Sequence, residues 1–149
     1  SVTLNPYMGF DSIEPFLKYE DKISFILVLT SNKSAENFEK IKNENGKYLY
    51  QNVLDSINNW NINNNCGIVF GATKLEELKQ NIENFNNLYV LLPGVGAQGG
   101  SLEDVTKLFK TVKNNNYLVN ISRALIYCEN SPQFPKIIQE TINNYNKMS

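Results

Sequence analysis

Histidine is absent from the 149 residues, and arginine occurs only once, as Arg123. Without histidine the chain cannot form a Ser-His-Asp or Cys-His nucleophile, nor a histidine-based metal site. The two cysteines, Cys66 and Cys128, lack CxxC spacing, which argues against a zinc site and suits a reducing compartment. These gaps exclude many enzyme mechanisms, and we expect no bound metal.

The chain also has little net charge and no long apolar run. Lysine and arginine total 14 against 15 aspartate and glutamate, a formal charge of -1, which gives no reason to expect nucleic acid or an anionic membrane as a partner. No run approaches the roughly 18 apolar residues of a membrane span, and we find no signal peptide. We therefore expect a cytoplasmic protein in which any small anion is held by local groups.

Short apolar runs alternate with amphipathic segments along the whole chain. The runs are mostly continuous, as in strands buried on both faces of a parallel sheet, and cover 2–4, 25–29, 67–71, 88–92 and 118–121. The segments between and after them have helical spacing at 50–57, 75–82, 102–112 and 134–145. Parallel neighbours need a crossover helix, so the pattern predicts an α/β fold in one domain or part of one.

Two of the predicted helices carry start signals. Thr73 with Glu76, and Ser101 with Asp104, have the spacing of an N-cap and a carboxylate three residues later. We expect both hydroxyls to cap their helices.

The stretch PGVGAQGG, residues 93–100, lies between a predicted strand and the helix that Ser101 begins. Its glycines allow the backbone to turn tightly and approach a ligand, and the helix start offers unpaired N–H groups to an anion. We predict a phosphate-binding loop made of Gly94, Val95, Gly96, Ala97 and Gly99, to which Gln98 adds a side-chain amide. The alternative is a glycine-rich turn that only connects two elements.

The same glycines, Gly94, Gly96 and Gly99, satisfy GxGxxG, so a dinucleotide-binding Rossmann unit is a second interpretation. That motif usually follows the first strand of a domain and precedes an acidic residue about 20 positions on. Here it follows the fourth predicted strand, and the next strand ends in Ser122 and Arg123. The Rossmann interpretation is therefore the weaker one.

Arg123 fits another rule, because (β/α)8 barrels often bind phosphate with the loops after strands 7 and 8. A guanidinium can bind a phosphate with two parallel N–H bonds. If the last two strands are barrel strands 7 and 8, Arg123 and the glycine-rich loop occupy those positions; otherwise Arg123 is a solvated surface charge. Thr30 and Ser31 follow the second strand and could bond a polar heterocycle or cap the next loop.

In order, the segments VTLNPYMGFDS (2–12), VLTSN (28–32), GIVFGAT (67–73), LLPGVGAQGG (91–100) and NISRA (120–124) resemble the second half of the orotidine 5′-monophosphate decarboxylase family. The resemblance spans nearly the whole chain. It implies strands 4 to 8 of a TIM (β/α)8 barrel, with strands 1 to 3 absent from residues 1–149. A complete barrel usually takes about 250 residues, which agrees with this partial-domain interpretation.

The resemblance also implies an activity and site residues. Members convert orotidine 5′-monophosphate to UMP and CO2, in the last step of UMP synthesis, with no metal or organic cofactor. It assigns Ser31 to the pyrimidine ring, Pro93 to its apolar wall, Gln98 to both ring and phosphate, and Arg123 with the Ser122 amide to the phosphate. Two positions depart from the family pattern: Ser122 stands where glycine is common, and Lys33 where proline is common.

The family's proton donor and charged Lys/Asp network belong to a DxKxxD motif on strand 3, which these residues lack. We therefore expect no catalytic residue within the chain and no activity from it alone, since the chemistry needs those charges beside the reacting carbon. Family members are usually homodimers, and a complementing N-terminal segment would support the interpretation. The alternatives are another phosphosugar-binding barrel enzyme, such as an epimerase or aldol-type synthase, and a non-catalytic half-barrel module.

Overall fold

The computed structural model describes residues 1–85, 87–112, 115–127 and 133–148. Five strands form one sheet in the order β1-β2-β3-β4-β5, and every neighbouring pair is parallel. The strands are β1 (Val2–Leu4), β2 (Ser24–Leu29), β3 (Cys66–Phe70), β4 (Tyr89–Pro93) and β5 (Tyr117–Asn120). The predicted α/β class is confirmed, and each strand begins and ends within one residue of its predicted range.

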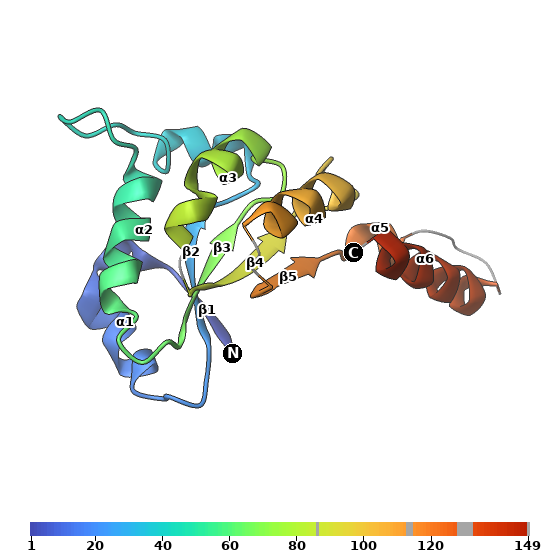
Figure 1. The fold of residues 1–149 in the computed structure, drawn as a ribbon, viewed down its shortest axis with the longest axis horizontal. Coiled ribbons are helices and arrows are strands. Elements are labelled where there is room, and N and C mark those ends of the chain that lie inside the picture. Colours follow the sequence, from blue (N-terminus) through green and yellow to red (C-terminus); the bar gives the residue numbers. More distant parts are fainter. Residues whose placement is uncertain (86, 113–114, 128–132, 149) are drawn as a thin grey trace.

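Helices connect the strands and lie mainly along one side of the sheet (Figure 1). They are α1 (Phe10–Leu17), α2 (Leu49–Trp60), α3 (Leu75–Asn81), α4 (Leu102–Thr111), α5 (Arg123–Ile126) and α6 (Phe134–Met148), with short 3-10 turns η1 (Pro6–Met8), η2 (Lys33–Asn37) and η3 (Ile82–Phe85). The four predicted amphipathic segments are all helical over most of their length. Within the described residues, no helix combines the length and apolar character needed to cross a bilayer.

The two predicted helix caps have different outcomes. Ser101 is the N-cap of α4, and its hydroxyl accepts a hydrogen bond from the Asp104 amide at 3.2 Å, so this cap is confirmed. The other is wrong, because Lys74 is the N-cap of α3 and Thr73 Oγ1 is buried without a hydrogen-bond partner among the described residues. The chain reaches α3 one residue later than the pattern predicts, which leaves Thr73 before the cap position.

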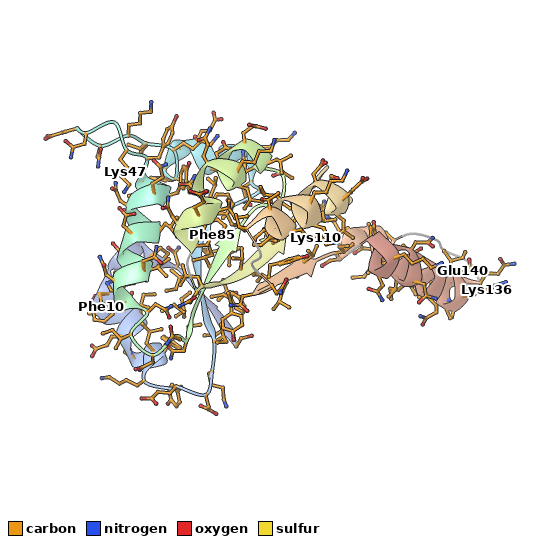
Figure 2. The ribbon with its side chains drawn as sticks, in the orientation of Figure 1. Phe10, Lys47, Phe85, Lys110, Lys136 and Glu140 are labelled. Atoms are coloured by element: carbon orange, nitrogen blue, oxygen red, sulfur yellow. The ribbon has the colours of Figure 1, made fainter. Side chains whose placement is uncertain are left out.

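The core lies between the sheet and its helices. Alternate strand residues, such as Ile26, Ile68 and Val90, are fully buried in one cluster with Leu54 of α2 and Phe109 of α4. Charged side chains point outward, as Figure 2 shows for Lys136 and Glu140 on α6, whose charged groups are 3.9 Å apart. The main apolar core of the described residues therefore lies on the helical side of the sheet.

The opposite face of the sheet is apolar as well. The parallel register aligns Leu27, Val69, Leu91 and Leu118 across four neighbouring strands. Side chains alternate between the faces of a strand, so this row lies opposite the helical core. Leu118 is 55% exposed, which shows that this face is only partly covered.

Candidate functional site

The carboxyl ends of β2, β3 and β4 approach one another closely. Beyond the ladder, the Gly71 amide donates to the Leu29 carbonyl at 2.7 Å, and the Ala72 amide donates to the Pro93 carbonyl at 2.8 Å. A Cβ atom at Gly71 would lie 2.7 Å from the Ser31 nitrogen, so only glycine permits this approach. Ser31 is thereby packed against the end of β3 at the edge where parallel α/β sheets bind ligands.

Ser31 and Gln98 form the central contact of this edge. The Ser31 hydroxyl donates to Gln98 Oε1 at 2.9 Å, which joins residues 67 positions apart in sequence. Gly94 lies beside the pair, because a Cβ there would be 3.0 Å from Gln98 Oε1 and 3.1 Å from Ser31 Cβ. With its oxygen engaged, the Gln98 amide keeps its NH2 group as a donor toward solvent or a ligand.

The glycine-rich loop is a compact turn. Gly94, Gly96 and Gly99 have φ values of 101°, 80° and 92°, in the region that favours glycine. The loop closes on itself through bonds of 2.8 to 3.1 Å, in which the Gly99, Gly100 and Gly96 amides donate to Gly96, Gly94 and Gly100 carbonyls respectively. These bonds fix the backbone of the loop in its turn conformation.

The side chains of the loop divide into two sets. Val95 is buried in the helical core, so only its main chain can serve a ligand, whereas Ala97 and Gln98 are exposed. Pro93, the last residue of β4, is half-buried. The buried Val95 side chain therefore anchors the loop to the core, and the exposed tip of the loop carries the Gln98 amide.

The loop also contacts the segment after β5. A Cβ at Gly96 would lie 3.0 Å from Ala124 Cβ, so the two segments touch one residue beyond Arg123. Arg123 is exposed and begins α5, and the preceding Ser122 hydroxyl donates to Asn120 Oδ1 at 2.8 Å. The structure therefore brings the glycine-rich loop together with the Arg123 segment, and joins the same loop to Ser31 on its other side.

The hydroxyl pair after β2 is divided between two partners, which the sequence did not indicate. Thr30 donates from its amide to Glu39 Oε2 at 2.7 Å and from its hydroxyl to Glu39 Oε1 at 2.9 Å. Ser31, in contrast, bonds to Gln98. Glu39 carries no local signal for this role, because it is nine positions from Thr30 and the turn η2 lies between them.

An ion pair fixes the segment that carries Glu39. Lys40 pairs with Glu77 of α3, and both side chains are about one-fifth exposed. The hydrogen bond that Lys40 donates to Glu77 raises the pKa of Lys40, although burial opposes it. Burial acts to raise the pKa of Glu77, but the hydrogen bond and charge of Lys40 outweigh it, so the pKa of Glu77 lies below its ordinary value. Both groups are charged at neutral pH, and the pair ties the loop after β2 to α3.

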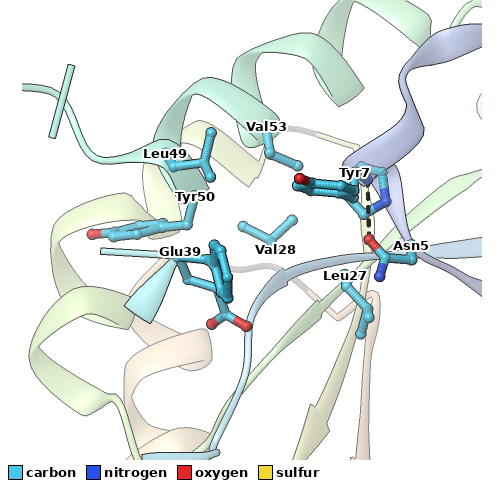
Figure 3. Close-up of a pocket in the computed structure, with 10 residues that line it drawn as sticks. Asn5, Tyr7, Leu27, Val28, Glu39, Leu49, Tyr50 and Val53 are labelled. Carbon is cyan, nitrogen blue, oxygen red and sulfur yellow. Dashed lines mark hydrogen bonds between the residues drawn. The ribbon is translucent and has the colours of Figure 1, made fainter. Parts of the chain in front are cut away.

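A hollow of about 610 Å³ lies between residues that follow β1, the end of β2 and its following loop, and the start of α2 (Figure 3). It is mostly apolar and is lined by Asn5, Pro6, Tyr7, Leu27, Val28, Phe38, Glu39, Leu49, Tyr50 and Val53. Glu39 is the one residue that belongs both to this lining and to the Thr30 contact. None of the predicted site residues lines this hollow.

Residues suited to metal binding or thiol chemistry are sparse in the described part of the chain. It contains no group of three or more His, Cys, Asp or Glu side chains that could hold a metal ion. Burial raises the pKa of the Cys66 thiol to about 11, so this thiol is protonated and unreactive at neutral pH. Cys128 lies outside the described residues.

Known proteins resemble this chain in sequence and in structure. Residues 1–133 match the family model described as the orotidine 5′-phosphate decarboxylase / HUMPS family. The chain is 44% identical over 137 residues to orotidine 5′-phosphate decarboxylase of Christiangramia forsetii, which covers 92% of this chain and 50% of that protein. It superposes on Leishmania donovani OMP decarboxylase with a TM-score of 0.80 and 31% identity, covering 98% of this chain and 56% of that one.

A second solved structure, Leishmania donovani UMP synthase, gives the same TM-score of 0.80 at 33% identity, covering 98% of this chain and 32% of that one. The predicted fold, part of a TIM (β/α)8 barrel, is confirmed by these superpositions together with the all-parallel strand order. The chain spans about half the length of the curated relatives it matches.

Proposed function

Because the chain belongs to the orotidine 5′-phosphate decarboxylase / HUMPS family, we propose that it is the pyrimidine- and phosphate-binding part of an enzyme that decarboxylates orotidine 5′-monophosphate to UMP. The observation that carries the proposal is the continuous contact from Ser31 through Gln98 and the glycine-rich loop to the Arg123 segment. These groups follow the carboxyl ends of the parallel strands β2, β4 and β5, which lie on the same edge of the sheet. That edge is where barrel enzymes bind their substrates.

Each residue has a role that its chemistry supports. The Ser31 hydroxyl and the Gln98 amide offer a donor and acceptor set for the polar edge of a pyrimidine, and Pro93 supplies an apolar wall. The Gln98 NH2 group, the exposed loop tip at Ala97 and Gln98, and the Ser122 amide offer donors for a phosphate, whereas the Gly96 and Gly99 amides are already bonded within the loop and serve to shape it. Arg123 adds a guanidinium that can bond two phosphate oxygens at once.

Binding of this kind contributes to catalysis at a distance. Decarboxylation breaks the bond between the pyrimidine ring and the carboxylate, releases CO2, and leaves an electron pair on the ring carbon that must then be protonated. Binding energy from the phosphate, which does not react, can be directed to the reacting centre. We assign the proton donor and the charges beside the reacting carbon to a DxKxxD motif outside residues 1–149, and we assign no catalytic residue to these 149 residues.

The remaining proposals concern the whole protein. We propose that residues 1–149 form strands 4 to 8 of one barrel domain, and that strands 1 to 3 come from an N-terminal segment. The family resemblance supports a homodimer in the cytoplasm that acts on a free nucleotide with no cofactor. The alternative of another phosphosugar barrel enzyme has less support, because curated relatives at 36–44% identity carry the decarboxylase name.

The test uses the protein expressed from its complete gene. We expect turnover of orotidine 5′-monophosphate to UMP, and we expect Arg123→Ala to raise KM by about 100-fold or more, because two charge-assisted bonds of about 1.5 to 3 kcal/mol each are lost. Lys22→Ala, an exposed cation at the amino end of β2, is the matched control and should leave KM unchanged. An unchanged KM for Arg123→Ala would remove Arg123 from the phosphate site, and binding of a pentose phosphate but not UMP would favour the alternative enzyme.

A further inference from the structure

The rim residue Ser31 is held in place from behind by a carboxylate. Both oxygens of Glu39 accept hydrogen bonds from Thr30, one from its amide at 2.7 Å and one from its hydroxyl at 2.9 Å. A carboxylate that accepts two bonds from one residue fixes both the backbone and the side-chain rotamer of that residue. Thr30 is bonded directly to Ser31, so the fixed backbone sets the position of the next Cα.

Glu39 is itself firmly placed. Its amide donates to the Ala35 carbonyl at 2.8 Å, and its carbonyl accepts from the Tyr50 amide of α2 at 3.0 Å. The neighbouring Lys40 is paired with Glu77 of α3. The carboxylate is therefore anchored to η2, α2 and α3, and it transmits that rigidity to the end of β2.

The Glu39 contact also decides which of two adjacent hydroxyls is available at the rim. Thr30 donates its single hydroxyl proton to Glu39, and Ser31 donates its hydroxyl proton to Gln98. If Thr30 were released, its hydroxyl could compete for Gln98 or for a bound heterocycle, and Ser31 would lose its fixed backbone. Gly71 and Gly94 pack against Ser31 on two other sides. The Glu39 carboxylate controls the position of Ser31 through the neighbouring residue, Thr30.

We propose that Glu39 is a positioning residue that sets the Ser31–Gln98 pair and thereby the preference for a pyrimidine over a bare sugar phosphate. The proposal rests on the proposed function, because it assigns Ser31 and Gln98 to the base. Glu39 acts through Thr30 and does not touch the nucleotide. The phosphate is held by the glycine-rich loop and Arg123, which Glu39 does not contact.

Because the base and the phosphate are assigned to different residues, two ligands test the proposal. In the protein from its complete gene, Glu39→Ala should weaken UMP binding by about tenfold or more, the effect of losing hydrogen bonds to a charged group, while ribose 5-phosphate binding stays within about twofold. Glu39→Gln should recover most of the UMP binding, to within about threefold, because its oxygen accepts from the Thr30 amide and its NH2 group still holds the Thr30 oxygen; recovery is incomplete because the Thr30 hydroxyl proton is no longer bonded. Calorimetry gives both dissociation constants, and thermal unfolding shows that each variant is folded.

Two further variants complete the design. Glu36→Ala removes an exposed carboxylate from the same segment and should change neither ligand's affinity. Thr30→Val keeps the amide bond but removes the hydroxyl bond, so it should weaken UMP selectively even if Glu39→Ala does not fold. Equal losses for UMP and ribose 5-phosphate, or an unchanged UMP affinity in a folded Glu39→Ala protein, would overturn the proposal. A wild-type protein that fails to bind UMP would instead contradict the proposed function itself.

Discussion

Gly96 is the residue at which the glycine-rich loop meets the Arg123 segment. Its φ of 80° disfavours any side chain, and a Cβ would also meet Ala124 Cβ at 3.0 Å and Tyr145 Oη at 3.4 Å. Gly99, in the same loop with φ of 92°, has nothing within 4 Å of its Cβ position. A side chain at either position would strain the backbone, but only a side chain at position 96 would also contact neighbouring atoms.

We predict that Gly96→Ala and Gly99→Ala each destabilise the protein by about 1 kcal/mol through backbone strain. Gly96→Ala should in addition weaken UMP binding, because the new methyl group pushes the loop away from the Arg123 segment. Chemical denaturation measures the first effect and calorimetry the second. Equal UMP affinity in the two variants would show that the contact at Ala124 has no part in binding.

At this scale the sequence predicted residues whose signal is local. The spacing of the loop glycines predicts a turn at Gly94, Gly96 and Gly99, and Gln98 belongs to the same loop. Gly71 and Glu39 could not be found in this way, because their roles come from contacts across strand ends. Gly71 resembles any glycine at the end of a strand, and Glu39 resembles any surface glutamate until the fold brings it to Thr30.

Among the elements, the loop between β2 and α2 depends most on electrostatics. The pKa of Glu77 lies below its ordinary value of 4.5, since the effect of Lys40 outweighs that of burial. The unfolded chain therefore binds a proton at a higher pH than the folded one, and the stabilisation is full above pH 4.5 and is lost as the pH falls through the folded pKa. The pKa of Lys40 is raised above 10.5, so its contribution is complete throughout this acid range.

We expect Glu77→Gln to lower the free energy of unfolding by about 1 kcal/mol at about pH 7, and by less as the pH falls below the ordinary carboxylate pKa. Urea unfolding at several pH values measures this convergence. Glu103→Gln is the control, because its pair with Lys107 on α4 is largely exposed and should contribute little at any pH. Parallel curves for wild type and Glu77→Gln would contradict the assigned pKa shift.

The periodicity of apolar residues was sufficient to predict most of the strands and helices, but not all of them. The strands and the long helices have enough apolar residues to set their period, and they were predicted within a few residues. The helix α1 was missed: it has eight residues, begins after Gly9 and contains Pro15, a residue that normally ends helices. Tertiary contacts support it, since Ile13 and Leu17 are buried and the Asn65 side chain donates to the Leu17 carbonyl at 2.9 Å.

For the whole molecule, the open face of the sheet is the feature that needs a partner. Each of β1 and β5 pairs with only one described strand, and the row of Leu27, Val69, Leu91 and Leu118 is not covered by the helical core. Unpaired parallel edges and a contiguous apolar face favour association with other chains. In the proposed barrel, three further strands would close both edges and fill the interior with side chains.

We therefore predict that residues 1–149, prepared as an isolated polypeptide, associate with one another in a concentration-dependent manner during sedimentation. Leu118→Glu should reduce this association by placing a charge on the open face, whereas Ile62→Glu, at an equally apolar residue that is 83% exposed in the loop after α2, should not. Adding the segment that carries strands 1 to 3 should suppress association of the wild-type polypeptide but not restore a native barrel to Leu118→Glu, because the carboxylate would then be buried in an apolar interior. A wild-type polypeptide that remains monomeric at every concentration would show that this face is stable in water, and the half-barrel would then be a complete structural unit.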